Sequence, residues 1–265
     1  MSLFKKLRDL LYEPRLKGID PDSDELLVAH SRILFEKPMM RNVFAEFYDL
    51  CIHLDESYFS GEGKRVEIGA GVSFFKKNHP QILTTDIKQA SNLDMVVDAL
   101  NMPFENGSVR AIYGINCFHH FPDPGKFFKE LERVLTKGGG CILIDPYYGW
   151  VAKRFYSRIF ESEGFDMTQK TWTNDSLGYM NGANQALSYI VFERDKEKLE
   201  TLYPDLEIII KKPLNNYLRY LLSGGLNFRQ ILPSFTSPLI RLAEFLLTPL
   251  NRILALHHII VIRKK

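Results

Sequence analysis

Residues 66–71 read Val-Glu-Ile-Gly-Ala-Gly, and Asp86 ends the next strand-like stretch, which begins at Ile82. This pattern predicts a strand, a tight glycine turn and the start of a helix, followed by a second parallel strand with a carboxylate at its tip. Glycines let the backbone approach a ligand closely, and a carboxylate accepts hydrogen bonds from a ribose diol. The stretch therefore predicts a binding site for a nucleoside-containing cofactor.

The residues after the turn narrow the choice of cofactor. A dinucleotide fingerprint requires G-x-G-x-x-G/A, and Phe74 stands where its third small residue would lie. A P-loop is excluded because no Gly-Lys-Ser/Thr follows the turn. A pyrophosphate then has no cradle, so an adenosine ligand without one fits better. On this stretch alone, an ordinary turn beside a surface acid stays an alternative.

Composition sets outer limits on the class of protein. The chain has 265 residues, 45% hydrophobic and 25% charged, which is typical of a globular protein with one large α/β domain or two small ones. A net charge of +2 does not favour a broad nucleic-acid-binding face, so no nucleic acid partner is expected. Three widely spaced cysteines argue against a disulfide framework and against zinc, and we expect no metal site and a reducing cytosol. Basic residues break up the first apolar positions, which argues against a signal peptide.

From residue 64 onward, strand and helix patterns alternate. The patterns predict strands at 64–68, 81–86, 94–97, 109–115, 141–144, 206–210 and 259–262, with helices at 72–78, 124–136 and 147–160. Such alternation predicts an α/β protein with a parallel sheet covered on both faces. Ligands of these sheets bind at the carboxyl ends of the strands. The polar residues at or next to those ends are Glu67, Asp86, Asp98, Asn116 and Asp145.

The flanking segments read as additions to this core. Helical patterns at 3–12, 24–35 and 39–54 predict an N-terminal helical cap over 1–61, in front of a cofactor-binding domain over 62–265. Segments 147–204 and 211–256 are expected on the substrate side of that domain.

The apolar segment 211–256 is the least readable part of the chain. Charges at Arg229, Arg241, Glu244 and Arg252 argue against a transmembrane helix. Apolar stretches with flanking basic residues suit membrane-surface contact or a lipid-linked acceptor. A core helix pair and an oligomer interface are the alternatives, and the sequence does not indicate an oligomeric state.

Residues 66–146 resemble the class I S-adenosylmethionine-dependent methyltransferases, particularly the small-molecule branch that includes ubiquinone/menaquinone-biosynthesis-type enzymes. The order and spacing of the motifs both match; the motifs are Val66–Gly71, Asp86, Asp98–Phe104, Asn106–Ser108, Asn116–Pro124 and Glu130–Gly140. The family usually has glycine at position 73, where this chain has Ser73. The resemblance implies a Rossmann-like methyltransferase fold, an α/β architecture with a doubly wound, mostly parallel seven-stranded sheet. The N-terminal helical cap and a helical insertion before the last strand would be added to it.

The resemblance also implies roles in binding S-adenosylmethionine. The glycine turn would lie under the methionine part, Glu67 near its amino group, Asp86 on the ribose and Asp98 on the adenine. An alternative role for Asp98 is a turn cap before Pro103. The complete expected cofactor set is Glu67, Gly69, Ala70, Gly71, Asp86, Ile87, Asp98, Ala99, Leu100, Asn116 and Cys117.

Methyl transfer from a sulfonium needs chiefly alignment, so a catalytic base is optional. If the acceptor is a hydroxyl, a base within hydrogen-bond reach would help. The candidates are His119, His120 and Asp145, with Tyr147 and Tyr148 after them. A packing role for the two histidines and a turn role for Asp145 are the alternatives. His257 and His258 are expected at the surface or in an interface.

The sequence therefore predicts a soluble methyltransferase that acts on a small or lipid-linked molecule at oxygen or carbon. The expected location is cytoplasmic, with peripheral contact at a membrane surface left open. An NAD(P)-dependent oxidoreductase or nucleotide-sugar enzyme is an alternative. A non-catalytic, cofactor-binding regulatory protein is another, because one fold hosts both classes.

Overall fold

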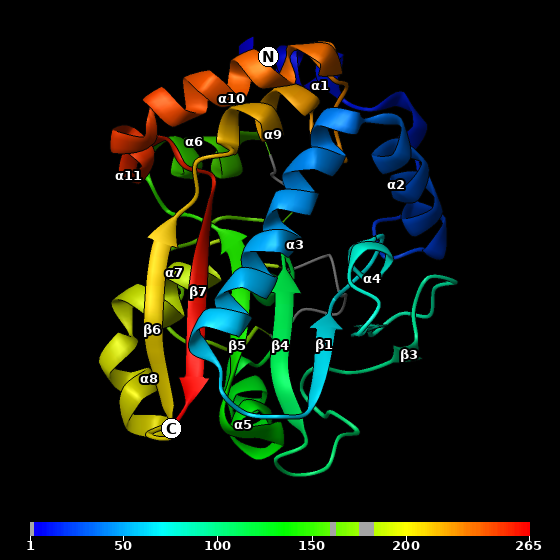
Figure 1. Ribbon diagram of the computed structural model, residues 1–265. Coiled ribbons are helices and arrows are strands. Elements are labelled where there is room, and N and C mark those ends of the chain that lie inside the picture. Colours follow the sequence, from blue (N-terminus) through cyan, green and yellow to red (C-terminus); the bar gives the residue numbers. More distant parts are fainter. Residues whose placement is uncertain (1–2, 160–162, 175–182) are drawn as a thin grey trace.

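A seven-stranded sheet of order β3-β2-β1-β4-β5-β7-β6 forms the centre of the molecule (Figure 1). The computed structural model describes residues 3–159, 163–174 and 183–265. The first five strands are parallel, and β7 runs antiparallel to both β5 and β6. The strands are β1 Lys64–Ile68, β2 Ile82–Asp86, β3 Met95–Val96, β4 Val109–Ile115, β5 Leu135–Pro146, β6 Leu206–Pro213 and β7 His257–Lys264. The predicted mostly parallel, doubly wound sheet is confirmed.

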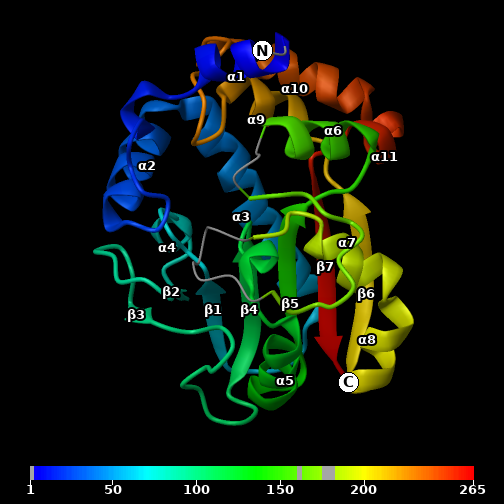
Figure 2. The same cartoon turned by 180° about the vertical axis from the view of Figure 1, so that it is seen from behind.

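Helices cover both faces of the sheet. The long helix α3 crosses one face, and α5, α7 and α8 cover the other (Figures 1 and 2). The helices are α1 Leu3–Leu11, α2 Asp24–Glu36, α3 Pro38–Tyr58, α4 Phe75–Asn78, α5 Pro124–Val134, α6 Trp150–Ile159, α7 Leu187–Tyr189, α8 Lys196–Leu202, α9 Tyr217–Ser223, α10 Ser237–Leu246 and α11 Asn251–Leu254. A π-turn at Ile190–Arg194 follows α7. No helix in the described ranges is long and apolar enough to cross a bilayer.

The alternation of side chains along the strands explains why the central strands read as continuous apolar runs. On β4, Ala111 and Tyr113 pack with Phe47 of α3, whereas Ile112 packs with Phe128 of α5. All five residues are buried. A strand that is buried on both faces needs apolar residues at every position.

A buried carboxylate fastens α3 to the sheet. Asp55 is 0% exposed and accepts hydrogen bonds from Arg65 Nε at 2.6 Å, Arg110 Nε at 2.8 Å and the Tyr113 hydroxyl at 2.8 Å. The partners lie on β1 and β4. Helix α3 therefore packs directly on the sheet, and the division into a cap over 1–61 and a domain over 62–265 stays a prediction.

Two of the predicted helices differ from the structure at their ends for identifiable reasons. The expected helix over 72–78 is reduced to α4, because Asn92 Nδ2 donates to the carbonyls of Gly71 and Ser73 and holds this segment as a turn. The helix expected to reach 136 ends at Val134, and the glycine run belongs to β5. A Cβ at Gly140 would lie 2.3 Å from the Ile262 carbonyl oxygen, so this strand needs glycine to pair closely.

A layer of helices lies beyond the carboxyl ends of β1, β4 and β5. It contains α1 from the N-terminal part of the chain, α6 from its middle, and α9, α10 and α11 from its C-terminal part (Figures 1 and 2). The expected helical insertion before the last strand is confirmed, since α9, α10 and α11 lie between β6 and β7. Two backbone hydrogen bonds join the ends of the chain, Arg229 N to Leu11 O at 2.7 Å and Glu13 N to Asn227 O at 3.0 Å.

Candidate functional site

A cavity of about 440 Å³ opens between the carboxyl ends of the parallel strands and the helical layer above them. All eleven residues expected to bind the cofactor line it: Glu67, Gly69, Ala70, Gly71, Asp86, Ile87, Asp98, Ala99, Leu100, Asn116 and Cys117. His119 and His120 line it as well, and Asp145 lies behind His119. The structure therefore brings the predicted residues together, while the role of each stays a prediction.

The glycine turn after β1 has a backbone conformation that favours glycine and, at Gly69, no room for a side chain. Gly69 and Gly71 have φ of +59° and +50°, a region that favours glycine. A Cβ at Gly69 would lie 2.5 Å from the Cys117 Cβ. Asn116, at the end of β4, also has a positive φ of 53°, and its buried Oδ1 has no hydrogen-bond partner among the described residues. An orphaned oxygen beside an open glycine turn fits a ligand that supplies a donor there.

Both predicted acids on the adenosine side stabilise their own turns. Asp86 accepts the Gly71 N–H at 2.8 Å and the Lys88 N–H at 3.0 Å, one on each carboxylate oxygen. Asp98 accepts the Leu100 N–H at 2.8 Å, so the alternative of a turn cap is present in the structure. A carboxylate oxygen has more than one acceptor position, so these bonds leave capacity for ribose or adenine donors.

Glu67 is buried under the turn and is held by the residue that departs from the family pattern. The Ser73 hydroxyl donates to Glu67 Oε2 at 2.9 Å and accepts the Phe75 N–H at 3.0 Å. Burial raises the pKa of Glu67 to about 8, although the Ser73 hydrogen bond acts in the opposite direction. Ser73 thus supplies a donor to a buried carboxyl group that a glycine could not supply.

At the other end of the cavity, a histidine lies between two carboxyl groups. His119 Nδ1 is 2.8 Å from Asp145 Oδ1, and its Nε2 is 3.6 Å from Glu163 Oε2. Burial acts to lower the pKa of His119, but the two acids together raise it to about 10. Burial acts to raise the pKa of Glu163, but the contact with the positively charged His119 lowers it to about 2. At neutral pH the imidazole is therefore protonated, and Glu163 presents a carboxylate to the cavity.

Sequence reasoning missed Glu163. It lies in the segment 147–204, which contains no motif that would place it near the end of β4. No local signal in the sequence could therefore have identified it. Gln185 from the same segment donates to Glu163 Oε2 at 2.5 Å. His119, His120 and Glu163 each offer one ligand atom within 4.8 Å of the others, an arrangement that could also hold a metal ion. The expectation that the protein has no metal site stays a prediction.

The prediction for the C-terminal histidines is wrong. His257 and His258 are 2% and 0% exposed, because β7 lies inside the sheet between β5 and β6. His257 lines the cavity, and His258 Nε2 lies 2.9 Å from the Ser188 hydroxyl oxygen. Burial lowers the pKa of both to about 3, so both rings are neutral at physiological pH.

The wall of the cavity away from the strands is largely apolar. Its side chains come from α2, α3, α6, α9 and the loop after α9; they are Leu26, Leu27, Leu34, Met40, Phe44, Tyr156, Tyr220 and Leu226. Glu163, Gln185 and His119 supply polar groups to the same cavity. This arrangement suits an acceptor with an apolar body and a polar reacting group.

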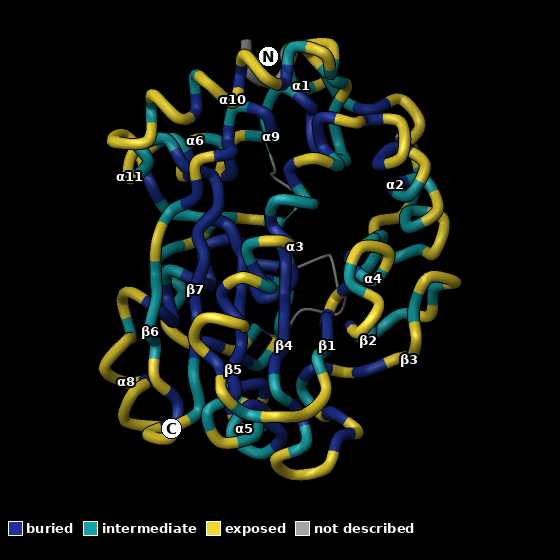
Figure 3. The backbone as a smooth tube through the Cα atoms, viewed as in Figure 1, coloured by how far each residue is buried: buried dark blue, intermediate teal, exposed yellow. Residues whose placement is uncertain are grey.

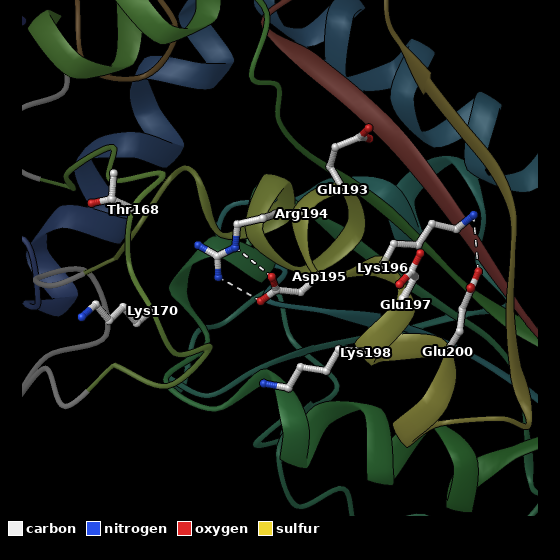
Figure 4. Close-up of a pocket in the computed structure, with 9 residues that line it drawn as sticks. All are labelled: Thr168, Lys170, Glu193, Arg194, Asp195, Lys196, Glu197, Lys198 and Glu200. Atoms are coloured by element: carbon white, nitrogen blue, oxygen red, sulfur yellow. Dashed lines mark hydrogen bonds and ion pairs between the residues drawn. The ribbon is translucent and has the colours of Figure 1, made fainter.

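A second, open hollow of about 930 Å³ lies beside α8 and contains none of the predicted residues (Figure 4). It is lined mostly by charged side chains that pair with one another. Arg194 Nε is 2.8 Å from Asp195 Oδ1, and Lys196 Nζ is 3.4 Å from Glu200 Oε1. We interpret it as a solvated surface of ion pairs.

Comparisons with known proteins also point to a methyltransferase domain. Residues 69–143 match the methyltransferase domain family. Tocopherol O-methyltransferase of Arabidopsis thaliana is 43% identical over 49 residues, which are 18% of this chain and 14% of that protein. Ajmaline N-methyltransferase of Rauvolfia serpentina is 37% identical over 49 residues, 18% of this chain and 17% of that protein. The matched region thus spans less than a fifth of these curated relatives.

Among solved structures, a geranyl diphosphate methyltransferase in complex with S-adenosylmethionine has a TM-score of 0.50 to this chain. The two share 12% sequence identity, and the superposition covers 96% of each chain. A likeness at this identity shows the fold: a seven-stranded Rossmann-like methyltransferase sheet with helices on both sides.

Proposed function

We propose, from the class I S-adenosylmethionine-dependent methyltransferase domain that this chain carries, that the protein transfers a methyl group to a small acceptor with an apolar body. The observation that supports this is one cavity in which the predicted cofactor residues and an apolar wall meet. The dinucleotide alternative is not favoured, because Phe74 packs edge-on against Tyr48 beside the turn, where a third small residue would be needed. The non-catalytic alternative and the nucleotide-sugar enzyme are not favoured either.

We assign the cofactor to the strand side of the cavity. When bound, S-adenosylmethionine supplies a methyl group on a sulfonium. Asp86 and Asp98 would hold the ribose and the adenine, with Ile87, Ala99 and Leu100 beside them. Glu67, Asn116 and the turn at 69–71 would hold the methionine end, where the orphaned Asn116 oxygen and the open backbone fit a ligand.

For an acceptor with an O–H group, we propose Glu163 as the proton acceptor. As the acceptor atom forms its bond to the methyl carbon, the carbon–sulfur bond breaks, and the proton left on the acceptor becomes strongly acidic. A carboxylate of low pKa is then a sufficient base, whereas the protonated His119 is not. His119 would position Glu163, and Asp145 would position His119. His120 lines the cavity and stays a candidate for contact with the acceptor.

The finer proposals concern the acceptor and its location. We propose a lipid-linked acceptor and a cytoplasmic location at a membrane surface; the support is the apolar cavity wall and the apolar helical layer above it. The resemblance to the ubiquinone/menaquinone-type branch stays a prediction of the sequence.

The test of function begins with titration calorimetry of S-adenosylhomocysteine and NAD⁺. We expect S-adenosylhomocysteine to bind and NAD⁺ not to bind; binding no tighter than about millimolar for the sulfur ligand would contradict the assignment. Methyl transfer to a panel of apolar alcohols, phenols and amines would then identify the acceptor class.

Glu163→Gln tests the base. We expect kcat for a hydroxyl acceptor to fall by about 10²–10⁴-fold, because the amide cannot take the proton. The affinity for S-adenosylhomocysteine should be unchanged, since Glu163 lies at the other end of the cavity. Glu193→Gln, at the charged hollow, is the matched control. A Glu163→Gln enzyme with normal kcat would overturn the assignment.

A further inference from the structure

The helical layer above the strands has an outer surface that is apolar. Nine of the sixteen large apolar side chains that are exposed among the described residues lie between 231 and 253. Figure 3 shows α10 as an exposed edge at the top of the molecule. We define the outer face of the helical layer as the exposed side chains of α10 and its two flanking turns, which are Phe235, Leu239, Leu242, Phe245, Leu246 and Leu250. Phe235 is 83% exposed and Leu239 71%, so nothing within the described chain covers this face.

The orientation of α10 is fixed from below. Glu244 is 1% exposed and accepts the Arg219 backbone N–H at 2.8 Å and Arg219 Nε at 2.6 Å. Arg219 also binds Glu46 of α3 through both of its terminal nitrogens, at 2.6 and 2.7 Å. Rotating α10 to bury its leucines would break this buried ion pair, which is strongly unfavourable. The outer face therefore stays directed outward.

The exposed charges around the outer face are almost all basic. Arg241 is 71% exposed and lies 3.8 Å from Glu46, which already binds Arg219. Arg252, and Lys153 and Arg154 on the neighbouring helix α6, are also exposed. In the described residues of α1, α6 and 231–254, Asp9 is the one exposed acid. With a net charge of only +2 for the whole chain, this layer holds a local excess of positive charge.

We propose that the outer face docks on an anionic membrane surface, with α10 lying in the plane of the interface. Leucines and phenylalanines beside arginines are the composition of interfacial helices, and basic residues are attracted to anionic headgroups. A second copy of this chain fits less well, because a two-fold contact would place arginines against arginines with almost no acid to pair with them.

Docking on a membrane would serve the proposed methyl transfer, and this role of the outer face rests on that proposed function. The same layer supplies Tyr220 and Leu226 to the apolar wall of the cavity. Docking would thus place the acceptor end of the cavity close to the lipids that carry an apolar substrate.

The test is co-sedimentation of the full chain with vesicles of phosphatidylcholine alone and of an equimolar mixture with phosphatidylglycerol. We expect binding to the mixed vesicles that weakens as salt is raised. The double variant L239Q/F245Q should bind roughly tenfold or more weakly, because it removes apolar contact with the interface. R241Q/R252Q should reduce the preference for the anionic vesicles. Leu202→Gln, an exposed apolar position on α8, is the matched control.

The outcomes separate docking from catalysis. S-adenosylhomocysteine titrations of the same variants should match the wild type, since none of the changed residues lines the cavity. Wild-type protein that binds S-adenosylhomocysteine but neither vesicle overturns the docking proposal and leaves the methyltransferase proposal standing. A dimer that L239Q/F245Q abolishes, in the absence of vesicle binding, would assign the face to contact between copies and overturn the proposal.

Discussion

Glu67 is a buried residue that would link binding of the proposed cofactor to pH. Its carboxyl group lies under the glycine turn with Ser73 as its donor, and burial raises its pKa to about 8. At pH 7 the ligand-free protein therefore holds a proton on Glu67. If the ammonium group of the cofactor lies beside it, as we propose, binding stabilises the carboxylate and expels this proton.

We expect S-adenosylhomocysteine binding at pH 7 to release a proton, seen as a binding heat that depends on the ionisation enthalpy of the buffer. The affinity should rise with pH and level off above about 8, the pKa at which Glu67 is half-ionised in the ligand-free protein. Glu67→Gln should abolish the difference between buffers. An unchanged buffer dependence in that variant would contradict the placement of Glu67 at the ammonium group.

The contribution of Glu67 to folding stability changes with pH in the opposite direction to the affinity for the cofactor. A carboxyl group with a raised pKa binds its proton more tightly in the folded state than in the unfolded one, so its contribution to stability is present at low pH. That contribution falls as the pH rises from the ordinary value of 4.5 to about 8. In the ligand-free protein, Glu67→Gln should therefore be more stable relative to wild type at pH 8.5 than at pH 5.

At the scale of single elements, α3 depends on Asp55. This helix covers one face of the sheet, and its Asp55 binds three partners on β1 and β4. The partners include two arginines whose side chains are 27% and 15% exposed, so they cannot be fully hydrated if the carboxylate is removed.

We expect Asp55→Ala to lower the free energy of unfolding by about 3–5 kcal/mol, because it leaves two partly buried guanidinium groups without their anion. Urea denaturation measures this loss. Glu56→Ala changes an exposed acid one residue away and should stay within about 0.5 kcal/mol of wild type. A loss of similar size in both variants would contradict a specific role for the buried carboxylate in attaching α3.

At the scale of the whole molecule, the two ends of the chain close the cavity together. Lys37 is 5% exposed and donates to the carbonyl oxygens of Gly225 at 2.8 Å and Phe228 at 2.5 Å. His30 of α2 lies 3.1 Å from Asn227 Oδ1. The N-terminal helices and the insertion before β7 thus pack together as one layer that covers the carboxyl ends of the strands.

Lys37→Met should leave those carbonyl oxygens without a donor and lower the free energy of unfolding by about 1–3 kcal/mol. It should also expose the 225–229 loop to limited proteolysis, because the side chain that ties it to the N-terminal segment is gone. Lys17→Met is the control at an exposed position. Unaltered proteolysis of the Lys37 variant would show that the backbone bonds at Leu11 and Glu13 suffice to hold the loop.

The sequence by itself determined the sheet and the cofactor side of the site. Glycines at 69 and 71, and acids at 67, 86 and 98, are local patterns with a local cause: a strand that ends in a turn fixes where its last side chains lie. Short apolar stretches separated by helical patterns located all seven strands, although the strand ends differed by two to six residues at β5, β6 and β7.

Only the tertiary structure decided which distant segments meet. Glu163 lies opposite His119, His257 is buried beside the cavity, and residues 225–229 bind Lys37. The same packing decided which face of α10 points outward, through the buried pair of Arg219 and Glu244. Periodicity reports how a segment is folded and which of its faces is apolar, but contacts between segments depend on the relative placement of whole elements. The chemistry of the acceptor end and the outer face is set by those contacts.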